Sequence, residues 1–145
     1  MTTVERLLET KGHIVWSIAP DASVFEAVQL MADKRVGALM VVERNELVGV
    51  ISERDYAREI VLKDRVSRDT PVSAIMTRRV LYVRPDQTLD ECMALMTEKN
   101  LRHLPVLDNG RLVGVISIRD VIKDLISEKE FLIEQLENYI TDRRV

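Results

Sequence analysis

The feature of this chain that most constrains its fold is an internal repeat with an offset of 65 residues. The phrase GVISERD at residues 49–55 returns as GVISIRD at residues 114–120. Residues 15–55 align with residues 80–120 without a gap, and 17 of these 41 aligned positions are identical. A repeat of this kind defines the unit that folds, so the chain predicts two copies of one small supersecondary unit.

Each copy predicts strands and helices in the order β-α-β-β-α. The first strand is a β-rich run that ends at a proline, and the first helix follows a capping box. Two apolar runs joined by a tight turn predict a hairpin, and a second helix follows the repeated phrase. Strand, helix, hairpin and helix are predicted at residues 14–20, 24–31, 38–51 and 53–63 in the first copy, and at 80–85, 89–96, 104–116 and 118–126 in the second.

The repeat leaves segments at both ends of the chain and between the copies. Thr2 and Glu5 have the spacing of a capping box and Gly12 suits a helix end, which predicts an N-terminal helix. The expected order is this helix in 1–12, the first copy in 13–63, a polar linker in 64–74, the second copy in 75–127 and an amphipathic helical extension in 128–145. Because a unit of this size buries little surface alone, the copies should pack sheet to sheet as an α/β fold with pseudo-two-fold symmetry.

The composition argues against several classes of protein. A net charge of -3 gives no basic surface for a nucleic-acid backbone, so we expect no nucleic-acid partner. No apolar run approaches the ~18 residues that would span a membrane, and the first residues have no signal-peptide character. Cys92 is the only cysteine, which excludes an internal disulfide and fits a reducing compartment. We therefore expect a cytoplasmic protein with no membrane partner.

No arrangement of residues typical of catalysis is found. The sequence has no Ser-His-Asp set, no glycine-rich phosphate loop and no Cys/His spacing for a metal. Asp55 and Asp120 could in principle act as acid and base, but they are equivalent residues of separate copies without an obvious base beside them. We expect neither an enzyme, nor a metal site, nor a catalytic cofactor.

The tandem β-α-β-β-α order and several phrases resemble the CBS domain, and two copies in series resemble a CBS pair, or Bateman module. The phrases are IMT at 75–77, VRPDQTL at 83–89, RHLPV at 102–106 and LVGVISIRD at 112–120. The resemblance covers about residues 12–127. It implies a regulatory module that binds an adenine nucleotide, foremost AMP or else ADP, ATP or NAD, between the two copies. It also implies a homodimer and a regulated partner protein, which the sequence does not identify.

The resemblance assigns the second copy a nucleotide site built on Asp120. A carboxylate offers two acceptor oxygens to the paired hydroxyls of a ribose, and the start of a helix favours a phosphate. Ser117 would bind ribose or the α-phosphate, and the basic pair Arg102 and His103 would meet phosphate, since a guanidinium offers a fork of donors. The adenine would lie by residues 77–82. This set is Asp120, Ser117, Arg102, His103, Arg119, Thr77 and Val80.

The equivalent site of the first copy would consist of Asp55, Ser52, Arg54, Ile14 and Val15. The first copy has Gly37 and Ala38 where the second has its basic pair. We therefore expect the Asp120 site to bind AMP more strongly, unless the basic pair reaches across to the other site.

Two alternatives stay open from the residues alone. Ser-x-x-Asp before an apolar helix is also a capping box that needs no ligand, and Arg54 and Arg119 also fit solvated positions in the first turn of a helix. The chain would then be a ligand-free dimerisation or adaptor module. Leu125, Leu132, Leu136 and Tyr139 recur near the helical period, so the C-terminal helix packs either on its own module or against a second subunit.

Overall fold

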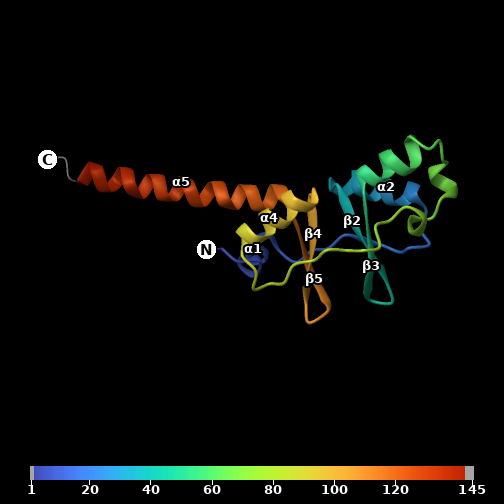
Figure 1. Ribbon diagram of the computed structural model, residues 1–145, viewed down its shortest axis with the longest axis horizontal. Coiled ribbons are helices and arrows are strands. Elements are labelled where there is room, and N and C mark those ends of the chain that lie inside the picture. Colours follow the sequence, from blue (N-terminus) through green and yellow to red (C-terminus); the bar gives the residue numbers. More distant parts are fainter. Residues whose placement is uncertain (1, 143–145) are drawn as a thin grey trace.

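The computed structural model describes residues 2–142, and Figure 1 shows two compact units with a long helix projecting from one of them. The strands of both units lie in the middle of the molecule and the helices lie on the outer sides (Figure 1). Strands β3 and β5 of the two units contact each other. The expected sheet-to-sheet packing of two α/β units is therefore confirmed.

The first unit contains a three-stranded sheet in the order β1-β2-β3, with β1 parallel to β2 and β2 antiparallel to β3. The second unit contains the antiparallel pair β4-β5. The elements of the first unit are β1 (Ser17–Ile18), α2 (Val24–Lys34), β2 (Ala38–Glu43), β3 (Glu46–Ser52), α3 (Glu53–Tyr56) and the π-helical segment η1 (Ala57–Val61). The elements of the second unit are α4 (Leu89–Lys99), β4 (His103–Asp108), β5 (Arg111–Ser117) and α5 (Ile118–Asp142). Helix α1 (Val4–Lys11) precedes both units, and two 3-10 turns, η2 (Ser67–Asp69) and η3 (Val72–Ala74), lie between them.

Both predicted hairpins are confirmed. Their two-residue turns have positive φ at both positions, 51° and 64° at Arg44 and Asn45, and 51° and 81° at Asn109 and Gly110. This backbone twist matches that of the flanking strands, which is why such turns favour Asn and Gly. Each hairpin also changes register at an equivalent place, between Val41 and Val42 in the first unit. The repeat in sequence is thus a repeat in backbone geometry.

The first strand of each unit is shorter than predicted. Only Ser17–Ile18 form β1 in the first unit, and residues 80–85 form no strand beyond a single parallel bridge between Val83 and Val106. Ile14, Leu81 and Tyr82 are exposed. The rest of each run passes between the units, so only Ser17–Ile18 and Val83 pair with a sheet.

The ends of the predicted helices differ from the structure in two places, the start of α1 and the end of α3. Thr3, not Thr2, caps α1 and accepts a hydrogen bond from the backbone N–H of Arg6, because Thr3 is held extended by a bridge to Thr88. The helix predicted at 53–63 changes to π-helical geometry after Tyr56. The predicted C-terminal extension is confirmed, since α5 continues without interruption from Ile118 to Asp142; residues 143–145 of the predicted extension lie outside the described residues.

Each unit has its own hydrophobic core, and each core includes residues from the segment that precedes the other unit. Val4, Leu7 and Leu8 of α1 belong to the core of the second unit. Val72, Ile75 and Met76, which follow the linker, belong to the core of the first unit. The N-terminal helix therefore packs on the second unit, and the segment between the units packs on the first.

The glycine of the repeated phrase makes room for these packed segments in both units. A Cβ added at Gly49 would lie 2.7 Å from Sδ of Met76, and one added at Gly114 would lie 2.8 Å from Cδ2 of Leu8. Both distances are shorter than carbon side chains tolerate. Each glycine thus leaves room for the segment that closes its unit. No helix among residues 2–142 has the length and apolar character that a membrane span requires.

Candidate functional site

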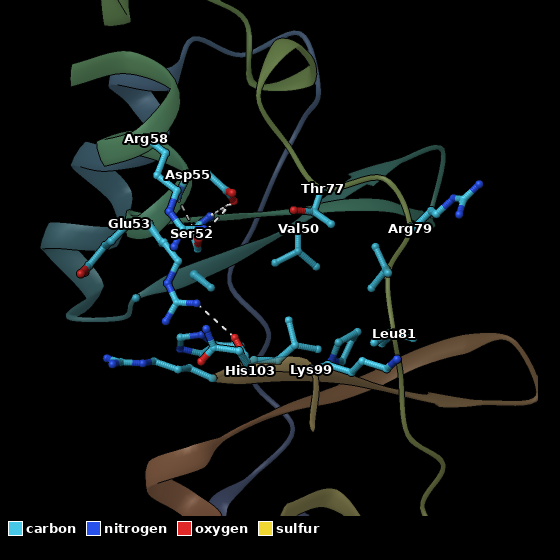
Figure 2. A pocket seen from close by; sticks show the side chains of 18 residues that line it. Val50, Ser52, Glu53, Asp55, Arg58, Thr77, Arg79, Leu81, Lys99 and His103 are labelled. Atoms are coloured by element: carbon cyan, nitrogen blue, oxygen red, sulfur yellow. Dashed lines mark hydrogen bonds between the residues drawn. The ribbon is translucent and has the colours of Figure 1, made fainter. Parts of the chain in front are cut away.

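A cleft with a volume of about 450 Å³ opens between the two units. This volume lies within the range of small-molecule sites in proteins. Four parts of the chain form its walls: the start of β2 at residues 37–38, the end of β3 with the helix that follows it, the crossing segment Thr77–Leu81, and the end of α4 with the start of β4. In Figure 2, Ser52 and Asp55 lie on the first-unit side, His103 and Lys99 on the second-unit side, and Thr77 and Arg79 on the segment that joins them. A ligand in this cleft would contact both units.

The crossing segment is fixed to the first unit by a backbone pair. The N–H of Thr77 donates to the carbonyl of Val50 at 2.8 Å, and the N–H of Val50 donates to the carbonyl of Thr77 at 3.0 Å. This pairing extends the sheet beyond β3 and places Val80 and Leu81 along the cleft. The backbone at Thr77 is therefore part of the same cleft wall as Asp55.

Ser52 and Asp55 form a complete capping box at the start of α3. The backbone N–H of Ser52 donates to Oδ2 of Asp55 at 2.9 Å, and the backbone N–H of Asp55 donates to Oγ of Ser52 at 3.2 Å. Burial raises the pKa of Asp55 against the opposing hydrogen bonds from Ser52. Among residues 2–142 no cation pairs with this carboxylate, and its hydrogen bonds from Ser52 both go to Oδ2. The Oδ1 atom of Asp55 is therefore available to a ligand.

The cleft is rich in positive charge. Five of its side chains are cationic, and two, Glu53 and Asp55, are carboxylates. The cations come from both units and from the crossing segment: Arg54, Arg58, Arg79, Lys99 and Arg102. Arg54 also joins the units directly, because its Nη1 donates to the carbonyl of Asn100 at 3.1 Å. An anionic ligand fits this balance of charge.

His103 lies where the two units meet. Burial lowers the pKa of His103, and the neighbouring cations Lys11, Arg102 and Arg54 lower it further against the attraction of Asp120. The small residue Gly37 faces it, since a Cβ added there would lie 3.2 Å from Cε1 of the imidazole. The ring is therefore neutral at neutral pH and reaches into the cleft because the first unit has small residues opposite.

The equivalent position of the second unit is filled by a side chain. Ser117 and Asp120 repeat the capping geometry, with the N–H of Ser117 donating to Oδ2 of Asp120 at 2.8 Å. The ammonium of Lys11 lies 2.6 Å from the same Oδ2 atom and donates to the carbonyl of Val115 at 2.6 Å. Burial alone would raise the pKa of Asp120, but the hydrogen bonds from Lys11 and Ser117 hold it below its usual value. The two repeated aspartates thus have opposite electrostatic environments.

The structure regroups the residues predicted for the two sites. Seven of them line one cleft: Ser52, Arg54, Asp55, Thr77, Val80, Arg102 and His103. Thr77, Val80 and Arg102, which were predicted to lie with Asp120, line the Asp55 cleft instead, because the segment before each unit crosses to the other unit. His103 faces Gly37 in the same cleft and also pairs with Ser117 across β4 and β5. The alternative in which the basic pair reaches across to Asp55 matches the geometry.

The remaining predicted residues lie outside this cleft. Ser117 and Asp120 lie by Lys11, and Arg119 lines a shallow groove on α5 instead. Ile14 is 71% exposed, and neither it nor Val15 lines the cleft beside Asp55. Their predicted grouping with Asp55 is also wrong, since the segment before the first unit runs along β5.

Sequence reasoning missed five residues that shape the site. Four line the cleft and one fills its counterpart: Arg58, Arg79, Lys99, Asn100 and Lys11. A difference between the copies could have indicated this arrangement. The first copy has small residues at 37–38, where the second copy has its basic pair. Cys92 is buried, and burial raises the pKa of its thiol to about 11, so it is a core residue and no nucleophile at neutral pH.

Comparisons with known proteins agree with this architecture. The family model of the CBS domain matches residues 12–62 and 72–127. The chain is 35% identical to the mitochondrial CBS domain-containing protein CBSX3 of Arabidopsis thaliana, covering 96% of this chain and 72% of that protein. Three other plant relatives are longer, and the chain spans 23% or 24% of their length.

Solved structures show the same fold. The CBS-domain structure of NE2398 has 51% sequence identity and a TM-score of 0.84, and the match covers 87% of this chain and 99% of that one. The CBS domain pair of MJ0100 was solved in complex with 5′-methylthioadenosine and S-adenosyl-L-methionine. That pair has 25% identity and a TM-score of 0.77 over 89% of this chain and 98% of its own. A related structure of this fold therefore holds adenosyl compounds.

Proposed function

This chain belongs to the CBS-domain family, and on that premise we propose that it binds an adenine nucleotide in the cleft at Asp55 and thereby regulates a partner protein. The single observation that carries the proposal is the composition of this cleft. A partly buried carboxylate with a free oxygen lies on one side, and cationic side chains line the rest. A ribose with two hydroxyls would bind the carboxylate, and a phosphate would bind the cationic side chains.

The charge of the cleft favours some adenosyl ligands over others. Five cationic side chains face two carboxylates. This excess of positive charge favours AMP, ADP, ATP or NAD, each of which carries phosphate. S-adenosylmethionine carries a sulfonium cation and fits less well. We propose AMP as the reference ligand and the phosphorylated nucleotides as its class.

Regulation would follow from the position of the cleft. Both units and the segment between them contribute to its walls. A ligand that contacts both units stabilises one relative arrangement over others and shifts the population towards it. A partner that recognises this arrangement would respond to the nucleotide. We propose a sensor role without catalysis, in the cytoplasm.

We also propose that the chain forms a homodimer, and α5 carries this proposal. Beyond its first turns, α5 presents a broad apolar face to solvent: Phe131, Leu132, Ile133, Leu136, Tyr139 and Ile140 are all more than half exposed. An exposed apolar surface of this kind marks an interaction site. The same observation supports the second candidate function, a dimerisation or adaptor module that needs no ligand.

Calorimetry with AMP and ATP on paired variants tests the nucleotide proposal. Asp55→Asn keeps an oxygen that can cap α3 but removes the negative charge, so the fold should persist. Loss of a charge-assisted hydrogen bond to ribose should weaken binding ~10- to 100-fold. Asp120→Asn is the matched control, because it makes the same change in the equivalent capping box and should leave the dominant binding event unchanged.

Two results would contradict the proposal. If Asp55→Asn binds as tightly as the wild type, Asp55 is a helix cap and does not bind ribose. If the wild type shows neither heat of binding nor thermal stabilisation with AMP, ADP, ATP or NAD, the adaptor function is favoured, because a ligand that binds the native state must raise its stability.

A further inference from the structure

The two copies of the repeated phrase end in different surroundings. In the first unit, the backbone of Thr77 pairs with Val50 and leaves Asp55 open to the cleft. Val115 is the repeat counterpart of Val50, and its carbonyl accepts from the side chain of Lys11 instead. The same ammonium lies 2.6 Å from Oδ2 of Asp120. One side chain therefore bonds both to the carboxylate that a ribose would meet and to the carbonyl that is the counterpart of Val50.

The position of Lys11 follows from the packing of α1. Lys11 is in the last turn of α1, and Leu7 and Leu8 of this helix are buried in the core of the second unit. The N-terminus of the helix is held by the carbonyls of Pro85 and Gln87, which accept from Glu5 and Val4. The base of the Lys11 side chain is thus fixed beside β5, while the side chain itself is one-third exposed.

We propose that Lys11 is an internal competitor for the ribose position at Asp120, and that it limits this chain to one nucleotide, bound at Asp55. The inference rests on the proposed function of the Asp55 cleft. The Lys11 ammonium neutralises the Asp120 carboxylate, whose charge would strengthen a hydrogen bond from a ribose hydroxyl, and it lies between this carboxylate and the carbonyl of Val115. Ligand could enter only where this ion pair opens.

The second position also lacks the basic pair. Arg102 and His103 line the Asp55 cleft, and their counterparts Gly37 and Ala38 carry no charge. Without Lys11, the position at Asp120 would offer a carboxylate to ribose but few cations to phosphate. The compound that it would take is an uncharged adenine nucleoside, in contrast to the phosphorylated ligand of the Asp55 cleft.

Calorimetry with adenosine and AMP on Lys11→Met tests this inference. The variant keeps a side chain of similar length without the charge. We expect the number of adenosine molecules bound per chain to rise from one to two, with the added event abolished by a further Asp120→Asn change. Lys11→Arg keeps the cation and should bind one, as the wild type does. A single event in Lys11→Met, or two in the wild type, would overturn the inference.

A second measurement does not depend on the Asp55 cleft. Carbon-13 NMR of the carboxyl groups should show that the pKa of Asp120 rises in Lys11→Met and remains low in Lys11→Arg. An unchanged Asp120 pKa in Lys11→Met would overturn the inference. A further outcome is that the wild type binds neither compound, whereas Lys11→Met binds adenosine through Asp120. In that case the function proposed for the Asp55 cleft fails and the role of Lys11 stands. If neither protein binds adenosine or AMP, both proposals fail.

Discussion

Replacing Leu8 with alanine should destabilise this protein strongly, although Leu8 precedes both copies of the repeat. The side chain is 1% exposed and lies in the core of the second unit. It fills the space beside Gly114, where an added Cβ would approach Cδ2 of Leu8 to 2.8 Å. No side chain on Gly114 can move into the space that the substitution leaves.

The expected loss can be estimated from this burial. Leu→Ala substitutions in cores cost ~2.7–5 kcal/mol, depending on how far the site collapses. Since α1 has one face exposed to solvent, its site is not enclosed on all sides, and we expect a value near the lower end, about 3 kcal/mol. With an unfolding entropy of about 2.1 cal/mol/K per residue, this corresponds to a fall in Tm of roughly 10 °C for 145 residues.

Urea unfolding followed by circular dichroism, together with calorimetry, would measure this loss. Ile14→Ala is the control, because Ile14 is 71% exposed and its truncation should change stability by less than about 0.5 kcal/mol. A loss below about 1 kcal/mol for Leu8→Ala would refute the reasoning. It would mean that α1 does not complete the second core and does not hold Lys11 beside Asp120.

Two further predictions concern pH and assembly. Burial lowers the pKa of His103, so its contribution to stability is complete above pH ~6.5 and declines as the pH falls towards the folded-state pKa. A bound phosphate favours the imidazolium form of His103, so AMP affinity should rise as the pH falls from 7.5 to 6. His103→Gln should remove this pH dependence. The same dependence of affinity on pH in the variant would contradict the prediction. Light scattering should give about twice the chain mass, and Leu132→Glu with Leu136→Glu should give a monomer, whereas a monomeric wild type would contradict the role of α5.

The pH prediction depends on the groups that surround the imidazole. Lys11, Arg102 and Arg54 oppose its protonation, and Asp120 favours it. The pH series should therefore be repeated with Lys11→Met, in which His103 loses one opposing charge and its pKa should rise. This result would separate the effect of Lys11 from that of burial.

The sequence by itself determined the features that depend on neighbouring residues. The hairpin turns at 44–45 and 109–110 follow from residue types that tolerate positive φ, and Ser23 and Thr88 cap their helices because their hydroxyls accept from an N–H three residues later. The repeat determined that two such units exist and that they pack together. Ser52 and Asp55 could be identified as a pair because their hydrogen bonds are local.

Only the tertiary structure decided which residues form one site. Lys11 and Asp120 are 109 residues apart, and Arg54 meets the carbonyl of Asn100 across 46 residues. No local pattern encodes such contacts, because they depend on which unit each crossing segment packs against. The short strand at 17–18 has the same cause, since residues 14–16 cross between the units while their β-rich composition predicts a longer strand. The two repeated aspartates look equivalent in sequence, and the packing of α1 makes one of them an ion pair and leaves the other open.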